Sequence, residues 1–318
     1  MNILVIDHEC HRKTKSADFF LDLLRTEHSI DVHYYKKHYS CKIPEEKIDW
    51  SDIVVFWEFL PSRFRLGIAG KPCVFVPMYD NEWSSYWQWR RLARSGMGII
   101  SFCGKVTEHA RRCGVQNILD VRYFPHPEDF PQKPGDSKRI FLWERGGIGV
   151  SIAKKLFPPD AGYVYDVKGA DEFLDRNKYI ERISKCGVVI APRRKEGIGM
   201  AFLEAMAMGK CVVAHNDATM NEYIEDGENG IIFDAKNPIR IPEESIVNVL
   251  NNVTQSTHQL YSQWMNDSIK VVTFLENQKS IDLSLGKRLK NALSFPFFLV
   301  EGVMYRLNER FSRKRNGL

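Results

Sequence analysis

The chain has 318 residues, of which 44% are hydrophobic and 27% charged, a balance typical of a folded protein of two domains and not of a disordered one. No apolar run approaches the roughly 20 residues that span a bilayer, and no basic segment precedes the strand-like start at Asn2–Ile6, so we expect neither a spanning helix nor a signal peptide. The net charge of +5 belongs to the tail 286–318, whose own charge is +6, so the overall basicity does not indicate a nucleic-acid partner.

Short apolar runs alternate with helix-length segments through residues 1–124. A polar loop (Asp7–Lys15) comes after the first run, and a helix is expected over Ala17–Arg25. This rhythm is typical of a parallel α/β sheet and predicts a first Rossmann-like domain. The expected strands are Ile3–Ile6, Asp31–Tyr35, Ile53–Trp57, Val74–Pro77 and Gly98–Phe102.

A proline-rich polar stretch interrupts the rhythm and predicts a linker over residues 125–138. The pattern then restarts and predicts a second Rossmann-like domain over 139–285. Its expected strands are Arg139–Trp143, Gly162–Val167, Gly187–Ala191 and Cys211–His215, and its expected helices are Val150–Phe157, Lys178–Lys185 and Met200–Met208. Two such α/β domains imply a cleft between them, with ligands at the carboxyl ends of the strands.

The stretch 188–214 reads as a buried strand, a basic loop with two glycines, a helix, a glycine stop and another buried strand. Glycines allow a ligand to approach the backbone, and the amides that enter the helix at Met200 form an anion site suited to a pyrophosphate. Arg193 and Arg194 add positive charge beside it. Glu196 and Glu204 could face the same pocket, where a carboxylate would accept hydrogen bonds from sugar hydroxyls. A glycine-bearing strand–loop–helix alone is common, and Glu204 alone could simply lie on a solvated helix face.

The combination is more specific. Seven residues separate Glu196 from Glu204, and Ala-Met-Ala-Met-Gly and a strand come next, then Asn221–Gly230 and the apolar run Ile231–Phe233. This arrangement closely resembles the donor half of the retaining GT-B glycosyltransferases with the EX7E motif, the group often called family 4. The resemblance is specific over about residues 186–234 and looser over 1–285. It implies a GT-B fold, with two Rossmann-like domains facing across a cleft.

The resemblance also implies roles for the matching positions. Glu204 would bind the ribose of the nucleotide, Glu196 would contact the donor sugar near its reacting end, and Arg145 would contact the pyrophosphate. The remaining donor-binding positions would be Gly197, Ile198, Gly199, Arg193, Arg194 and Glu222, the last of which helps to fix the loop after the next strand. The family's pyrophosphate lysine, six residues after Arg145, is Ser151 here, so Arg193, Arg194 or Lys154 would have to replace it. The family's histidine after the middle strand is replaced by Tyr79-Asp80.

As a function, the resemblance implies transfer of a hexose-type sugar, with retention, from a UDP- or GDP-sugar to a glycan or lipid-linked acceptor in cell-surface polysaccharide assembly. No other cofactor is expected. The sequence has no CxxC pair, HExxH motif or convincing DxD triplet, so a required metal is not expected either. The scattered cysteines fit a reducing cytoplasm. Two alternatives stay open, namely a non-catalytic subunit that binds sugar nucleotides or glycans, and a related epimerase or phosphorylase.

Two segments bear on the acceptor and the membrane. Residues 82–94 combine four aromatic residues with three arginines, which fits either an acceptor or headgroup site or a partly buried helix. In the tail 286–318, apolar residues fall on one helical stripe among basic ones. Such a helix could anchor the protein at the inner face of the cell membrane or pack on the first domain.

Overall fold

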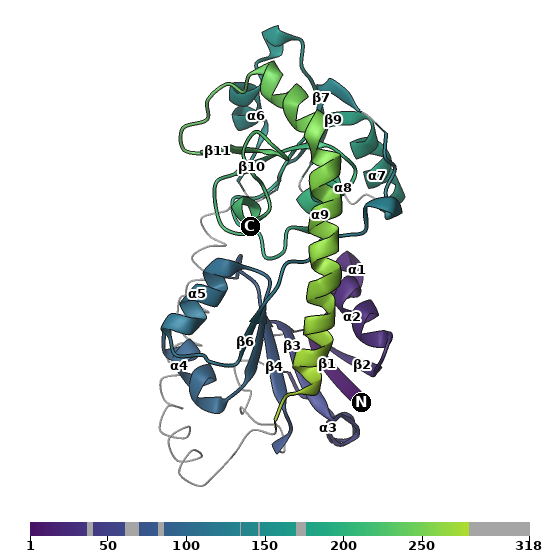
Figure 1. Cartoon of the computed structure of the whole chain (residues 1–318), viewed down its shortest axis with the longest axis vertical. Helices are drawn as coiled ribbons and strands as arrows, with labels where there is room; N and C mark the ends of the chain where they lie inside the picture. The colour runs from purple at the N-terminus through teal and green to yellow at the C-terminus, as the bar shows by residue number, and fades with distance from the viewer. Residues whose placement is uncertain are drawn as a thin grey trace.

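The computed structural model describes residues 1–36, 41–60, 70–81, 86–133, 135–145, 147–169 and 176–279. The chain forms two α/β domains stacked end to end (Figure 1). Each domain contains one sheet whose neighbouring strands are parallel. The predicted α/β class with two parallel sheets is therefore confirmed.

The first sheet has the strand order β2-β1-β3-β4-β5-β6. Its central strands are rich in Val, Ile and Phe and are buried, as expected for a sheet covered by helices on both faces. The strands are β1 (Asn2–His8), β2 (Ser29–Tyr35), β3 (Ile53–Glu58), β4 (Cys73–Pro77), β5 (Gly98–Ser101) and β6 (Ile118–Asp120). The helices are α1 (Cys10–Thr14), α2 (Asp18–Arg25), α3 (Glu45–Trp50), α4 (Tyr86–Ser95) and α5 (Gly104–Arg112).

The second sheet has the order β11-β10-β9-β7-β8. Its strands are β7 (Asp136–Trp143), β8 (Val164–Lys168), β9 (Cys186–Ile190), β10 (Cys211–His215) and β11 (Ile231–Phe233). Its helices are α6 (Val150–Leu156), α7 (Arg176–Ser184), α8 (Met200–Ala207) and α9 (Glu243–Glu276), with short 3₁₀ turns η3 (Pro159–Ala161) and η4 (Met220–Glu222). A further turn, η2 (Pro127–Asp129), lies in the connection between the domains.

Several boundaries differ from the sequence expectation. The predicted polar loop Asp7–Lys15 contains the last residues of β1 and the short helix α1. Strand β7 begins at Asp136, inside the stretch 125–138 that the prolines marked as a linker. The polar residues Asp136–Arg139 hide this half of the strand from a search for apolar runs. Helix α9, with 34 residues, was not predicted from the sequence at all.

Helix α9 runs from the second domain along the first (Figure 1). Its first turns pack in the core of the second domain through Ile246, Val249 and Val253. Its later turns contact the first domain, where Asp267 accepts a hydrogen bond from the backbone N–H of Arg122 at 3.2 Å. The helix therefore belongs structurally to both domains.

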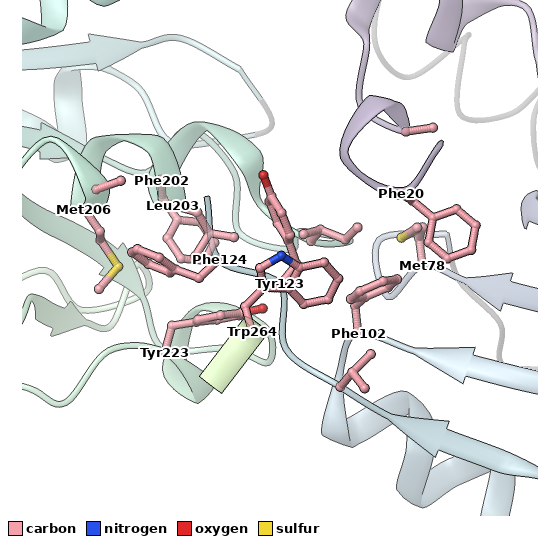
Figure 2. Close-up of a cluster of buried hydrophobic side chains, with 14 of the residues drawn as sticks. Phe20, Met78, Phe102, Tyr123, Phe124, Phe202, Leu203, Met206, Tyr223 and Trp264 are labelled. Atoms are coloured by element: carbon pink, nitrogen blue, oxygen red, sulfur yellow. The ribbon is translucent and has the colours of Figure 1, made fainter. Parts of the chain in front are cut away.

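One hydrophobic cluster continues across the domain junction (Figure 2). Tyr123, from the connection, and Trp264, from α9, have ring centroids 5.1 Å apart. They lie between Phe102 of the first domain and Phe202 of α8 (Figure 2). The junction is thus an extended apolar core and not a flexible tether.

Candidate active site

The loops that meet at the junction lie at the carboxyl ends of strands in both sheets. Tyr79, after β4, donates a hydrogen bond from its hydroxyl to Asp217, after β10, at 2.9 Å. The N–H of Gly104, after β5, donates to Oε2 of Glu222 in η4 at 2.8 Å. This edge of a parallel sheet is where open α/β folds bind their ligands.

The glycine-rich loop after β9 ends in the helix start that the sequence predicted. Gly199 has a φ of 83° and is the residue just before α8. A Cβ at this position would lie 2.0 Å from Cε1 of the buried Phe202, so only glycine fits. The first N–H groups of α8 lack intrahelical partners and can bind an anion at this edge. Ile198, which precedes Gly199, is buried.

Glu196 lies in the same loop and is only 8% exposed. Burial raises its pKa to about 7, although Arg193 and Arg145 act in the opposite direction. Its carbonyl oxygen accepts a hydrogen bond from Oγ1 of Thr219 at 2.8 Å. Thr219, at a φ of 72°, fixes the loop from the β10 side. The site thus holds a carboxylate that can carry a proton near neutral pH.

Glu204 lies one turn into α8 and is 5% exposed. Its Oε1 pairs with Nη1 of Arg176 at 2.8 Å. Burial raises the pKa of Glu204, and the ion pair with Arg176 opposes that rise. The guanidinium of Arg176 also lies 5.9 Å from the centroid of the Phe130 ring. Arg176 was not predicted as a site residue, because a single exposed arginine at a helix start forms no recognisable pattern in the sequence.

Arg145 comes after β7, and its guanidinium carbon lies 5.0 Å from the centroid of the Trp143 ring. Burial, with repulsion from Arg193, lowers the pKa of Arg145. It forms no ion pair with any carboxylate in the described ranges. Its loop pairs with the one after β9, since Arg194 donates from Nε to the carbonyl of Gly147 at 3.3 Å. Arg145 is exposed at this edge, so its guanidinium is accessible to an anionic ligand.

Lys168 is a further candidate for the role of the family's pyrophosphate lysine, which this sequence lacks. Lys154 lies exposed on α6. Lys168 ends β8 and is buried, and its Nζ lies 3.8 Å from the centroid of the Trp143 ring, the same ring that Arg145 contacts. A lone lysine at the end of an apolar strand was the only sequence signal for it.

Arg193 and Gly197, which were predicted to bind the donor, both contact the first domain. Arg193 pairs through Nη1 with Oδ2 of Asp80 at 2.8 Å. Gly197 lies against the same loop of the first domain, because a Cβ there would be 3.0 Å from Cβ of Met78. Neither contact across the junction leaves a pattern in the sequence.

The partners of Glu222 differ from those of Glu196 and Glu204. Its carboxylate accepts hydrogen bonds from the N–H of Gly104 and lies 2.6 Å from Nη2 of Arg122. Both partners belong to the first domain or to the connection. Its assignment as a donor contact stays a prediction, as do the roles of the other site residues.

The remaining expectations concern residues 82–94, the tail 286–318, and the absence of a membrane-spanning helix and of a metal site. Trp89, one of the aromatic residues of 82–94, is fully buried and is a core residue of the first domain. Residues 82–85 and the tail 286–318 lie outside the described residues. Within the described ranges, no helix has the length and apolarity to cross a membrane, and no cluster of His, Cys, Asp or Glu has the arrangement of a metal site.

Comparison with known proteins gives the context for this site. Residues 172–262, which include Glu196, Glu204 and Glu222, match the family described as Glycosyl transferases group 1. An uncharacterized glycosyltransferase of Methanocaldococcus jannaschii is 36% identical over 84 residues, which are 26% of this chain and 24% of that protein. Alpha-D-kanosaminyltransferase of Streptomyces kanamyceticus is 41% identical over 71 residues, 22% of this chain and 18% of that protein. The chain therefore spans about a quarter or less of the curated relatives it matches.

Solved structures extend the similarity to both domains. Sucrose-phosphate synthase of Thermosynechococcus elongatus has a TM-score of 0.62 at 11% identity and covers 87% of this chain and 98% of its own. Anabaena HepE, in complex with UDP, has a TM-score of 0.54 at 12% identity, over 87% of this chain and 100% of its own. At these identities the similarity establishes the fold, which is GT-B, as the sequence predicted. The chain therefore has the GT-B fold, and residues 172–262 of its second domain are similar to the group 1 glycosyltransferases.

Proposed function

We propose that this protein transfers a hexose-type sugar from a UDP- or GDP-sugar to a glycan or lipid-linked acceptor, with retention of anomeric configuration. One observation carries the proposal. Two buried carboxylates, Glu196 and Glu204, flank the start of α8 at the carboxyl edge of a parallel sheet. That constellation offers an anion site for a diphosphate between two acceptors for sugar hydroxyls.

Each residue takes one part of the donor in this proposal. Glu204, already oriented by Arg176, accepts hydrogen bonds from the ribose hydroxyls. Arg145 and Arg194, with the amides of Ile198 and Gly199 at the helix start, bind the diphosphate. Glu196 contacts the transferred sugar near its anomeric carbon.

The reaction breaks the bond between the anomeric carbon and the diphosphate oxygen and forms one to an acceptor hydroxyl oxygen on the same face. The hydroxyl proton passes to the departing diphosphate, so no separate side-chain base is needed. Positive charge and backbone amides stabilise the leaving group. In this scheme no metal ion is required.

The acceptor is part of the same proposal. A glycan or a lipid-linked glycan, as in cell-surface polysaccharide assembly, would bind from the side of the first domain. In this scheme the protein acts in the cytoplasm, at the inner face of the cell membrane when the acceptor is lipid-linked.

Thermal unfolding with UDP, GDP, ADP, CMP and their common sugars tests the donor site. A ligand at 100 times its dissociation constant stabilises the folded protein by about 2.7 kcal/mol, which is readily measured. We expect one nucleotide to raise the melting temperature of the wild type. Glu204→Ala and Glu204→Gln should abolish that rise, because neither retains the charged acceptor for the ribose hydroxyls.

Glu244→Ala, on the exposed start of α9, is the matched control and should respond to nucleotide like the wild type. A nucleotide response that survives in both Glu204 variants would show that the ribose site lies elsewhere. If no nucleotide or sugar nucleotide stabilises the wild type, the donor assignment is wrong.

A further inference from the structure

An arginine contact crosses the domain junction between the loop after β4 and the loop after β9. Nη1 of Arg193 lies 2.8 Å from Oδ2 of Asp80 and 3.9 Å from Oε2 of Glu196. The side chains of Arg193 and Asp80 are only 26% and 21% exposed. Water and salt screen such a pair less than one on the open surface. Arg193 therefore joins the first domain to the carboxylate that we assign to the donor sugar.

The loop that carries Asp80 is braced from within the first domain. His11 lies between two carboxylates, with Nδ1 2.5 Å from Asp7 and Nε2 2.6 Å from Glu58. Burial lowers the pKa of His11, but the hydrogen bonds to Asp7 and Glu58 outweigh it and hold that pKa well above its usual range, which favours the imidazolium form. Asn81, next to Asp80, donates a hydrogen bond to the same Glu58. Glu58 has a φ of 64°, a costly conformation for this residue that these contacts hold in place.

Gly197 also packs against side chains of the first domain. A Cβ on Gly197 would lie 2.8 Å from Oδ1 of Asp80 and 3.0 Å from Cβ of Met78, so a side chain there would have to displace these atoms. In the part of the chain that the structure describes, Oδ1 is buried and accepts no hydrogen bond of good geometry. The carboxylate is thus held by its other oxygen, through Arg193.

Building on the proposed function, we propose that Asp80 and Arg193 are a positioning pair, in which Asp80 orients Arg193 so that its guanidinium sets the position of the Glu196 carboxylate. From the sequence, Arg193 was expected to add positive charge beside the phosphates. Its two carboxylate neighbours argue for the positioning role, since a phosphate would have to displace both of them. Arg145, which has no such partner among the described residues, is better placed for the diphosphate. The donor loop is then completed by the first domain.

Four variants and one control test this pair. Asp80→Asn and Arg193→Gln break it, the double variant removes both charges, and Arg193→Lys keeps the charge. Lys105→Ala is the matched control, because Lys105 forms another ion pair across the junction, 3.1 Å from Asp217, and its other partner is Tyr79. The readouts are UDP and GDP affinity, hydrolysis of UDP-glucose and GDP-mannose, and infrared titration of the carboxylic-acid band that Glu196→Gln removes.

The charged groups facing Glu196 are Arg193, Asp80 and Arg145, with the phenol of Tyr179 nearby. Losing the Asp80 charge should move the titration midpoint of Glu196 down by about one pH unit, and losing the Arg193 charge should move it up by about as much. The double variant should return near the wild-type midpoint. Lys105→Ala should leave the midpoint unchanged.

Both single variants should lower kcat for donor hydrolysis about tenfold or more, with nucleotide affinity within about threefold of the wild type. The double variant should be no slower than the slower single variant, and Arg193→Lys should recover part of the rate. Two results overturn the proposal. One is a large loss of nucleotide affinity in Arg193→Gln with an unmoved Glu196 midpoint, which makes Arg193 a phosphate ligand. The other is midpoints in both single variants that move no more than in Lys105→Ala.

The infrared titration needs no substrate, so it separates this proposal from the proposed function. Absence of nucleotide binding by the wild type would remove the donor assignment alone. Unmoved midpoints in a protein that binds nucleotide would remove the positioning pair alone.

Discussion

Two carboxylates of similar burial differ in how their charge is balanced. Glu204 has a direct ion pair with Arg176 at 2.8 Å. Among the described residues, the cation paired with Glu196 is Arg193, which lies at 3.9 Å and also pairs with Asp80. Burial removes water from around both carboxylates, and the more distant arginine offsets this cost less for ionised Glu196 than Arg176 does for ionised Glu204. Burial raises the pKa of Glu196 to about 7, so this carboxyl group titrates near neutral pH.

This difference predicts a pH-dependent gain in stability for Glu196→Gln. The folded-state pKa of Glu196 lies above the unfolded value of 4.5, so the folded wild type binds more protons between these values and loses stability as the pH rises from about 4.5 through 7. Glu196→Gln has no carboxyl group to ionise at this position, so its stability does not fall with pH for this reason. Its free energy of unfolding relative to the wild type should therefore rise between pH 5 and pH 8, by at most about 3 kcal/mol. Urea unfolding at both pH values measures the effect, and a difference that is the same at both would contradict it.

At the scale of elements, the sequence predicted best those segments that have a simple periodicity. The bounds of β9, α8 and β10 were predicted to within one or two residues. Buried runs of Val, Ile, Ala and Met bounded by glycines are compatible with few other secondary structures. The start of β7 and the whole of α9 were missed, because β7 opens with polar residues and α9 buries different faces against different domains. The contacts of Arg193 with Asp80 and of Glu222 with Gly104 depend on how the domains dock, which a local pattern cannot encode.

The start of α8 gives a prediction with an internal control. Gly199 and Gly162 both have a left-handed backbone, with φ of 83° and 80°, but a Cβ would meet Phe202 at 2.0 Å only at Gly199, and nothing within 4 Å at Gly162. Gly162→Ala should cost about 1 kcal/mol of stability, for the backbone conformation alone. Gly199→Ala should cost about 2–4 kcal/mol, because overpacking adds to it. Chemical denaturation compares the two, and equal losses would mean that Phe202 moves aside freely.

At the scale of the molecule, the apolar cluster at the junction should make the two domains unfold together. Trp264 is buried in that cluster, 5.9 Å from Phe19 and 5.1 Å from Tyr123 between ring centroids. Trp264→Ala should cost about 3–5 kcal/mol and separate the single unfolding transition into two. Met265→Ala, at the next position and 48% exposed, should change stability by no more than about 0.5 kcal/mol. Calorimetry checks both, and a small loss with one transition in Trp264→Ala would mean that the cluster does not couple the domains.

Among the residues that the structure describes, the chain passes between the domains twice, once between β6 and β7 and once as α9 (Figure 1). A single strand of chain would let one domain swivel in any direction about the other. Here the two connections touch through Tyr123 and Trp264. Two connections allow the domains to rotate relative to each other only about an axis that runs close to both of them. We therefore expect a rotation of one domain against the other to keep the contact of Arg122 with Glu222, because Arg122 lies in the first connection, and to break contacts far from both connections first.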